Sequence, residues 1–326
     1  MPQAELSASD TRASFMGAPL DLQGHRGARG LAPENTLSAF KKALEIGVTT
    51  LELDVGITSD LVPVISHNPF LEPDFTRDAG GNWLTDEDHI IYKMDIKTLK
   101  TFDVGRINPS TRYSGKYPDQ VAADGERIPT LLEVIELIKS TGNETVRLNI
   151  ETKISPLKPE LMPGYKVFTD ALMAVLGEQG FMDRVTIQSF DWRVLQDVQY
   201  RFPNTPTSYL SVQQSWYDTV TPGPSGVSPW AAGFRLSDFD GSLPKMVKAA
   251  GGKMWSVYFK ELNSELVKEA HSLGLLVKVW TVNETGDMER LIDMDVDGII
   301  TDYPDKLRQI MKNRGMVLPP QSSVRK

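Results

Sequence analysis

The stretch Leu275–Lys312, LLVKVWTVNETGDMERLIDMDVDGIITDYPDKLRQIMK, decides the fold. It predicts a strand over Leu275–Val282 and a helix over Asp287–Ile292, followed by a strand over Gly298–Thr301 and a helix over Lys306–Lys312. A strand, a helix and a second strand in this order favour parallel neighbours in one sheet.

The same alternation extends backwards through most of the chain. Further strands are predicted over Leu20–Gly24, Thr50–Ile57, Leu61–Ser66, Thr145–Glu151, Val185–Gln188, Thr207–Leu210 and Met254–Tyr258. Further helices are predicted over Asn35–Ile46, Thr130–Ser140, Lys166–Gly177, Trp192–Phe202, Leu243–Ala250 and Ser264–Leu273. About eight such units predict an α/β fold that closes into a TIM (β/α)8 barrel. An open doubly wound sheet is the alternative, but no G-x-G-x-x-G motif opens a helix after an early strand.

Residues 69–127 interrupt the alternation over 59 residues that are rich in Gly, Pro, Asp, Asn and Tyr. Only Asp95–Phe102 has weak helical character. A loop of this length is uncommon unless it is functional. We therefore predict that it is an insertion and that it lies on the same face of the barrel as the active site. We expect a single barrel domain over residues 20–316, with an N-terminal extension over 1–19 and a C-terminal tail over 317–326.

Composition limits the possible partners. The 35 Lys and Arg against 43 Asp and Glu give a net charge of −8, which opposes sequence-independent binding to nucleic acid. The absence of Cys excludes disulfides, Cys-ligated zinc and thiol nucleophiles. No apolar run predicts an integral membrane segment, and nothing in the sequence indicates an oligomeric state. We expect a periplasmic or secreted protein whose leader is absent, with a cytoplasmic protein as the alternative.

The first group of polar residues is His25-Arg26-Gly27, directly after the first predicted strand. Catalytic groups of TIM barrels lie at the C-terminal ends of strands. A histidine and an arginine there supply a proton-transfer group and a cation that can bind phosphate or carboxylate. A strand-end histidine that only hydrogen-bonds a loop is the alternative.

The second group is Glu52-Leu53-Asp54. Alternation along a strand places both carboxylates on one face, where burial is costly unless a cation compensates it. The oxygen ligands suit Mg²⁺ or Ca²⁺. A hairpin turn centred between Asp60 and Leu61 would place His67 opposite Asp54, as a second acid or base.

Other candidates lie at the ends of later strands. Glu151 would add a third carboxylate to a metal site, and Lys153 would neutralise a phosphate oxygen or pair internally with a carboxylate. Gln188 is a candidate hydrogen-bond donor to substrate, and Trp280 is a candidate pocket wall or a core residue. Asp302 is expected to be a turn residue before the last helix. Together these groups favour metal-assisted cleavage of a phosphodiester.

An ordered set of motifs over about Leu20–Lys312 resembles the glycerophosphodiester phosphodiesterase family. The matching motifs are His25-Arg26-Gly27, Pro33-Glu34-Asn35-Thr36, Glu52-x-Asp54, His67, Glu151-x-Lys153, Gln188-Ser189-Phe190-Asp191, Val279-Trp280-Thr281-Val282-Asn283 and Gly298-Ile299-Ile300-Thr301-Asp302-Tyr303-Pro304.

The resemblance implies a TIM barrel with an insertion after the second histidine, and hydrolysis of a small glycerophosphodiester to an alcohol and sn-glycerol 3-phosphate. Carried over by position, it implies one divalent cation, Mg²⁺ or Ca²⁺, on Glu52, Asp54 and Glu151. It also implies His25 and His67 as the general acid/base pair, and Arg26 and Lys153 as phosphate ligands. The implied mechanism runs through a cyclic phosphate that water then opens.

Two alternative functions are considered, and one residue departs from the family motif. Phospholipase D-like phosphodiesterases or lyases that act on lysophospholipids share this constellation, but they carry a small loop where this chain has its insertion. A non-catalytic binding barrel is the other alternative. Many family members carry Asp directly after the second histidine, where this chain has Asn68. Strand alternation predicts that Asn68 points away from the His67 side and has a supporting role.

Overall fold

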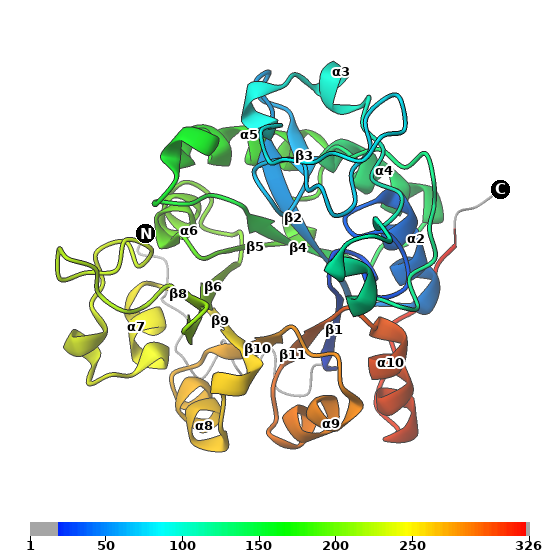
Figure 1. The fold of residues 1–326 in the computed structure, drawn as a ribbon. Helices are drawn as coiled ribbons and strands as arrows, with labels where there is room; N and C mark the ends of the chain where they lie inside the picture. Colours follow the sequence, from blue (N-terminus) through cyan, green and yellow to red (C-terminus); the bar gives the residue numbers. More distant parts are fainter. Residues whose placement is uncertain (1–18, 324–326) are drawn as a thin grey trace.

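The computed structural model describes residues 19–323, and within them eight parallel strands form a closed barrel (Figure 1). The barrel strands are β1 (Asp21–Gly24), β2 (Thr50–Ile57), β4 (Arg147–Thr152), β5 (Val185–Ser189), β6 (Thr207–Ser211), β9 (Met254–Tyr258), β10 (Leu276–Trp280) and β11 (Gly298–Thr301). The barrel closes because β1 pairs with both β2 and β11. The predicted TIM barrel is therefore confirmed, and the open sheet is wrong.

A helix follows each barrel strand along the chain and packs outside the ring (Figure 1). These helices are α2 (Leu37–Ile46), α4 (Leu131–Thr141), α5 (Tyr165–Glu178), α6 (Trp192–Arg201), α7 (Leu243–Ala249), α8 (Ser264–Ser272), α9 (Thr285–Asp293) and α10 (Pro304–Asn313). In α2, Thr36 caps the first turn, Phe40 and Leu44 face the core, and Gly47 ends the helix at φ 88°. Each helix buries an apolar stripe in this way, as its sequence periodicity predicts.

The inside of the barrel carries amide side chains, where branched apolar residues are more usual. The Asn149 amide donates to Gln23 Oε1 at 2.8 Å and to Gln188 Oε1 at 3.0 Å. Deeper in the barrel, Lys278 Nζ lies 2.7 Å from Asp21 Oδ2. Because buried polar groups are costly unless they are bonded, this network gives the site above it a fixed polar floor.

A hairpin leaves the barrel after β2, and its register differs from the prediction. Strand β3 (Pro63–Ile65) pairs antiparallel with β2, so that Val55 faces Ile65. The turn is centred on Asp60, so the register is shifted by one residue from the predicted one, and Leu61 within the turn takes a left-handed φ of 62°. The predicted opposition of His67 and Asp54 is therefore wrong. The backbone carbonyl of Asp54 instead accepts a hydrogen bond from the backbone N–H of Ser66 at 2.9 Å.

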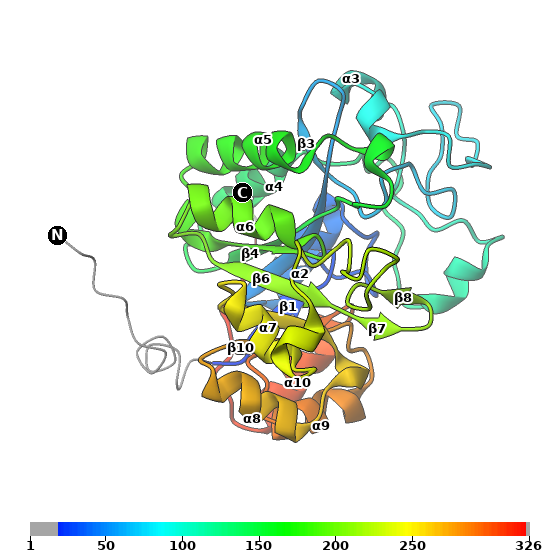
Figure 2. The same ribbon diagram turned by 90° about the vertical axis from the view of Figure 1, so that its left-hand side faces the viewer.

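The insertion forms a small body with its own apolar cluster. It contains the one-turn helix α3 (Ile96–Leu99), within the segment predicted to be weakly helical. The cluster consists of the buried insertion residues Leu71, Ile91, Leu99, Phe102 and Val104, together with Val64 of β3 and Ile128 directly after the insertion. Figure 2 shows the insertion and the hairpin β7 (Gln213–Gln214)–β8 (Tyr217–Asp218) on the same side of the barrel.

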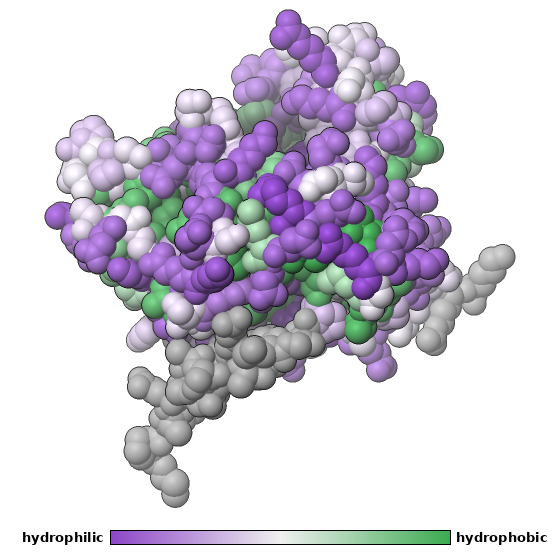
Figure 3. Space-filling model, turned by 90° about the horizontal axis from the view of Figure 1, so that it is seen from below, coloured by the Kyte–Doolittle hydropathy of each residue, from purple (hydrophilic) through white to green (hydrophobic). Residues whose placement is uncertain are grey.

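The described part of the C-terminal tail packs against helices of the barrel. The backbone N–H of Ser322 donates to Leu44 O at 2.9 Å, and the Asn143 amide donates to Ser322 Oγ at 2.7 Å. The predicted N-terminal extension lies, apart from Pro19, outside the described residues. Among the residues that are described, no helix has the length and apolar character that crossing a membrane requires. Polar side chains dominate the face seen in Figure 3.

Candidate active site

Three carboxylates meet at the C-terminal ends of two neighbouring strands. Glu52 and Asp54 project from β2, and Glu151 projects from β4, where it pairs in register with Asp54. One oxygen of each carboxylate lies within 4.8 Å of the others, and all three residues are buried. The alternation Glu-x-Asp thus places both β2 acids on the barrel interior, as the sequence predicts.

Their electrostatics make this cluster suitable for a cation. Burial and the neighbouring carboxylates raise the pKa of Glu52 well above its usual range. Burial also raises the pKa of Glu151, against the opposing effect of Lys153. Burial alone would raise the pKa of Asp54, but Arg26, His67 and Lys153 hold it below its usual range. Asp54 Oδ1 is buried without a hydrogen-bond partner. A hard divalent ion that takes oxygen ligands fits this donor set.

Two cations border the carboxylates. Arg26 NH1 lies 2.5 Å from Glu34 Oε1, and Arg26 Nε lies 3.1 Å from Asp54 Oδ2. Arg26 has a left-handed φ of 50°, and its backbone N–H donates to Glu52 Oε2 at 3.0 Å. Lys153 Nζ lies 2.6 Å from Glu151 Oε1 and 3.8 Å from Asp54 Oδ1. Lys153 therefore makes the predicted internal ion pair at the predicted site.

His25 is held by Asp302, whose contact with the site was not expected from the sequence. Its Nδ1 lies 2.6 Å from Asp302 Oδ1, and its Nε2 lies 3.9 Å from Glu52 Oε2. Asp302 lies in the bend before α10, as expected for a turn and helix-start residue, but it also bonds His25, which was not expected. Because β11 pairs with β1, the residue after β11 lies beside the residue after β1. Asp302 also accepts hydrogen bonds from Arg29 at 2.7 and 3.1 Å and from Asn283 at 2.7 Å.

This network fixes the charges around His25. Although burial opposes ionisation, Arg29 and His25 hold the pKa of Asp302 far below its usual range, so the carboxylate is charged. Burial and the positive charge of Arg29 lower the pKa of His25, while Asp302 raises it in opposition. Arg29 was not predicted from the sequence, although it follows the His25-Arg26 motif by only three residues.

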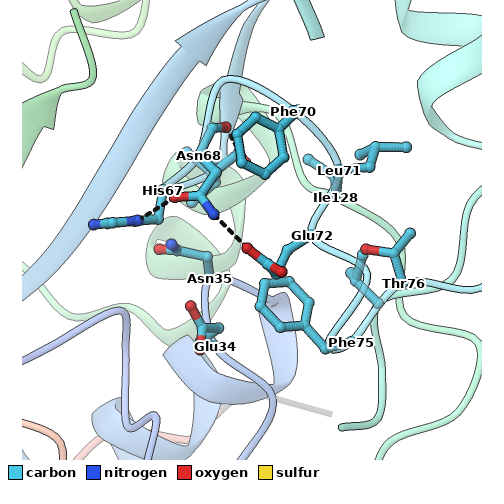
Figure 4. A pocket seen from close by; sticks show the side chains of 13 residues that line it. Glu34, Asn35, His67, Asn68, Phe70, Leu71, Glu72, Phe75, Thr76 and Ile128 are labelled. Carbon is cyan, nitrogen blue, oxygen red and sulfur yellow. Dashed lines mark hydrogen bonds between the residues drawn. The ribbon is translucent and has the colours of Figure 1, made fainter. Parts of the chain in front are cut away.

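His67 has a different partner. Its Nδ1 lies 2.7 Å from Asn68 Oδ1, and the Asn68 amide donates to Glu72 Oε2 at 2.5 Å (Figure 4). The expectation that Asn68 points away from His67 is wrong, because the strand ends at Ile65 and its alternation does not continue. Burial, with the positive charges of Arg26 and Lys153, lowers the pKa of His67 well below its usual value.

The two remaining predicted residues lie near the carboxylates. The buried Gln188 amide donates to Glu52 Oε1 at 2.8 Å, and it therefore orients that carboxylate. Trp280 packs edge-on against Phe190, with ring centroids 5.5 Å apart, and it also contacts Tyr258. Its indole N–H donates to Ser256 O at 3.2 Å. Contact of Gln188 or Trp280 with substrate stays a prediction.

The insertion adds two tyrosines that sequence reasoning did not single out. The Tyr113 hydroxyl donates to Glu34, which also accepts from Arg26. The Arg29 guanidinium lies 4.8 Å from the centre of the Tyr117 ring. The sequence feature that could have indicated these tyrosines is the tyrosine content of the insertion, which is otherwise polar. The insertion thus contacts Arg29 directly and reaches Arg26 through Glu34.

Comparisons with known proteins give the family of this chain. The pattern of the glycerophosphoryl diester phosphodiesterase family matches residues 25–306. A glycerophosphodiester phosphodiesterase of Caldanaerobacter subterraneus subsp. tengcongensis is 31% identical, over 89% of this chain and 97% of its own length.

Solved structures show the same fold. A relative from Silicibacter pomeroyi DSS-3, whose name assigns it to the same family, superposes with a TM-score of 0.80 at 36% identity, covering 91% of this chain and 94% of its own. An Oleispira antarctica phosphodiesterase, solved with its product sn-glycerol-3-phosphate, has a TM-score of 0.66 at 23% identity, covering 92% of this chain and 98% of its own.

Proposed function

This chain belongs to the glycerophosphoryl diester phosphodiesterase family and is a phosphoric diester hydrolase, and on that premise we propose that it converts small glycerophosphodiesters to an alcohol and sn-glycerol 3-phosphate with one divalent cation. The observation that carries the proposal is the meeting of three buried carboxylates with two histidines at one end of the barrel. The product bound by the Oleispira antarctica relative supports the choice of product.

Glu52, Asp54 and Glu151 are the proposed ligands of the cation, Mg²⁺ or Ca²⁺. When bound, the cation would neutralise charge that develops on the phosphate oxygens. Arg26 and Lys153 border the same carboxylates, so their positive charges can also contact the phosphate.

The histidines are the proposed proton carriers. In each ring Nδ1 is engaged, by Asp302 in His25 and by Asn68 in His67, which leaves both Nε2 atoms for substrate. Burial and Arg29 lower the pKa of His25, but the Asp302 carboxylate at Nδ1 opposes them and stabilises positive charge on the ring, so His25 is assigned as the proton donor. His67, with its lower pKa, starts neutral and accepts a proton.

The proposed reaction has two steps. A hydroxyl of the glycerol moiety attacks phosphorus and gives its proton to His67, while His25 protonates the oxygen of the departing alcohol. One P–O bond forms and one breaks, which leaves a cyclic phosphate. Water then opens the ring, giving its proton to His25 while His67 returns its proton to the glycerol oxygen.

The first test is release of glycerol 3-phosphate from glycerophosphocholine. The purified protein is assayed after chelation and again with Mg²⁺ or Ca²⁺ added back. We expect release that depends on the cation and falls about 10²-fold or more in Glu52→Ala and in His25→Ala. Asp86→Ala, in an exposed acidic residue of the insertion, is the matched control and should retain full activity.

Three results would contradict parts of this proposal. Absence of release from folded, metal-loaded protein would favour a non-catalytic barrel or another diester. A cyclic phosphate as the final product would favour the lyase reaction. Undiminished cleavage of a substrate analogue without the attacking hydroxyl would exclude the cyclic intermediate.

A further inference from the structure

We propose that Glu72, in the insertion, is a positioning residue for His67 that acts through the side-chain amide of Asn68. This inference rests on the proposed role of His67 as proton acceptor. The chain His67–Asn68–Glu72 is continuous, with 2.7 Å between His67 Nδ1 and Asn68 Oδ1 and 2.5 Å between Asn68 Nδ2 and Glu72 Oε2 (Figure 4).

The orientation of the Asn68 amide follows from what each group can donate or accept. An ionised carboxylate only accepts hydrogen bonds, so Glu72 requires the NH₂ group of Asn68 on its side. The carbonyl oxygen of Asn68 must then face His67. A carbonyl oxygen also only accepts, so Nδ1 of His67 carries the hydrogen and Nε2 of the neutral ring keeps its lone pair.

Without the Glu72 carboxylate, no group fixes this orientation of the Asn68 amide. The Asn68 amide could rotate by half a turn and present its NH₂ group to Nδ1, which would then have to accept. The hydrogen of the neutral His67 ring would move to Nε2, and that atom could no longer take a proton from substrate. Glu72 therefore selects the tautomer of His67 that can act as the base.

The surroundings of Glu72 are suited to this role. Glu72 is half-buried and borders a small cavity of about 20 Å³, together with Phe70, Leu71 and Phe75 (Figure 4). Partial shielding from water strengthens its bond to Asn68. The charged groups near Glu72 are Asp74 and Glu87, and those near His67 are Arg26, Lys153 and Asp54.

Three variants test the proposal. Glu72→Gln keeps the size but can donate as well as accept, so kcat should fall about tenfold while KM changes little. Asn68→Asp alone brings two carboxylates together and should also lose activity. The double variant Asn68→Asp/Glu72→Gln restores an acceptor toward His67 and a donor behind it, so kcat should recover to within about threefold of the unmodified protein.

The tautomer of His67 is also measured directly, alongside the kinetic assays. The protein contains four histidines, so selective ¹⁵N labelling resolves His67 by comparison with His67→Gln. We expect the hydrogen on Nδ1 in the unmodified protein and in the double variant, and a shift toward Nε2 in Glu72→Gln. Glu87→Gln, in an exposed acid near Glu72, is the matched control and should change neither kcat nor the tautomer.

The outcomes separate this inference from the proposed function. Full kcat in Glu72→Gln, additive losses in the double variant, or Nδ1–H retained in Glu72→Gln would each overturn it. If the unmodified protein releases no glycerol 3-phosphate, the proposed function fails, but the tautomer measurement still decides whether Glu72 orients His67.

Discussion

The two histidines are held by different parts of the molecule. The Nδ1 atom of His25 meets a charged carboxylate, Asp302, that follows the last barrel strand. The Nδ1 atom of His67 meets a neutral amide, Asn68, whose own carboxylate partner lies in the insertion. The barrel thus places a negative charge beside His25, whereas the insertion orients the amide that bonds His67.

The two supports also differ in rigidity. Asp302 is 0% exposed and receives three side-chain hydrogen bonds besides its contact with His25. The Asn68–Glu72 pair is half-buried at the edge of a small cavity. Because a buried, fully bonded charge has no alternative partner, substitutions on the barrel side should have larger effects than those on the insertion side.

The largest effect is expected for Asp302→Asn. Loss of the carboxylate leaves Arg29 unpaired and removes the group that favours protonated His25, so kcat should fall about 10²- to 10⁴-fold. The pKa of His25 should drop further, which moves the alkaline limb of the pH–rate profile to lower pH. Initial rates across pH measure both changes.

The matched control for that variant is Asp287→Asn, which removes a surface ion pair with Arg290 and should leave the rate unchanged. If Asp302→Asn cost no more activity than Glu72→Gln, the two histidines would not differ in the way their surroundings indicate.

An intermediate effect is expected for Arg29. Its guanidinium bonds both oxygens of Asp302, which lysine cannot do, so Arg29→Lys should lower kcat about tenfold. Its charge is kept, so the alkaline limb should stay in place. Arg29→Gln removes a charge that lowers the pKa of His25, and the limb should move to higher pH. A shift in the opposite direction would mean that Arg29 acts on another group.

The smallest effect is expected at the contact between the insertion and the barrel. Tyr113→Phe removes the hydroxyl that bonds Glu34, the partner of Arg26, and should raise KM about threefold with little change in kcat. Tyr117→Phe is the matched control, because the ring over Arg29 is retained. Substrate saturation curves distinguish the two variants. Equal KM values for both variants would contradict a role for the Tyr113 hydroxyl.

Much of the fold follows from local patterns. The strand Thr50–Ile57 occurs with the predicted bounds. Its apolar residues alternate with polar or small ones over the whole segment, a pattern that is typical of a strand. The carboxylates of Glu52 and Asp54 then face the barrel interior by the geometry of a strand alone. Placement of Glu151 beside them required only that the two strands be neighbours.

Other parts of the site depend on long-range pairing or on the register of a hairpin. Asp302 meets His25 across 277 residues of sequence, because the last strand pairs with the first. No local pattern contains that contact. Leu61 in the hairpin turn takes a left-handed conformation, which is uncommon for a leucine and so was not expected. The hairpin register is shifted by one residue from the predicted one, so that Ser66 and not His67 meets Asp54.

The pairing of the last strand with the first also has a consequence for biosynthesis. A nascent chain that has just exposed His25 must be extended by 277 residues before Asp302 exists. At typical rates of translation this takes roughly 15 to 55 s. Until then the first strand lacks a closing neighbour, and its histidine lacks the charge that we propose prepares it to donate a proton. Ribosome-bound intermediates are therefore expected to leave cellular phosphodiesters intact.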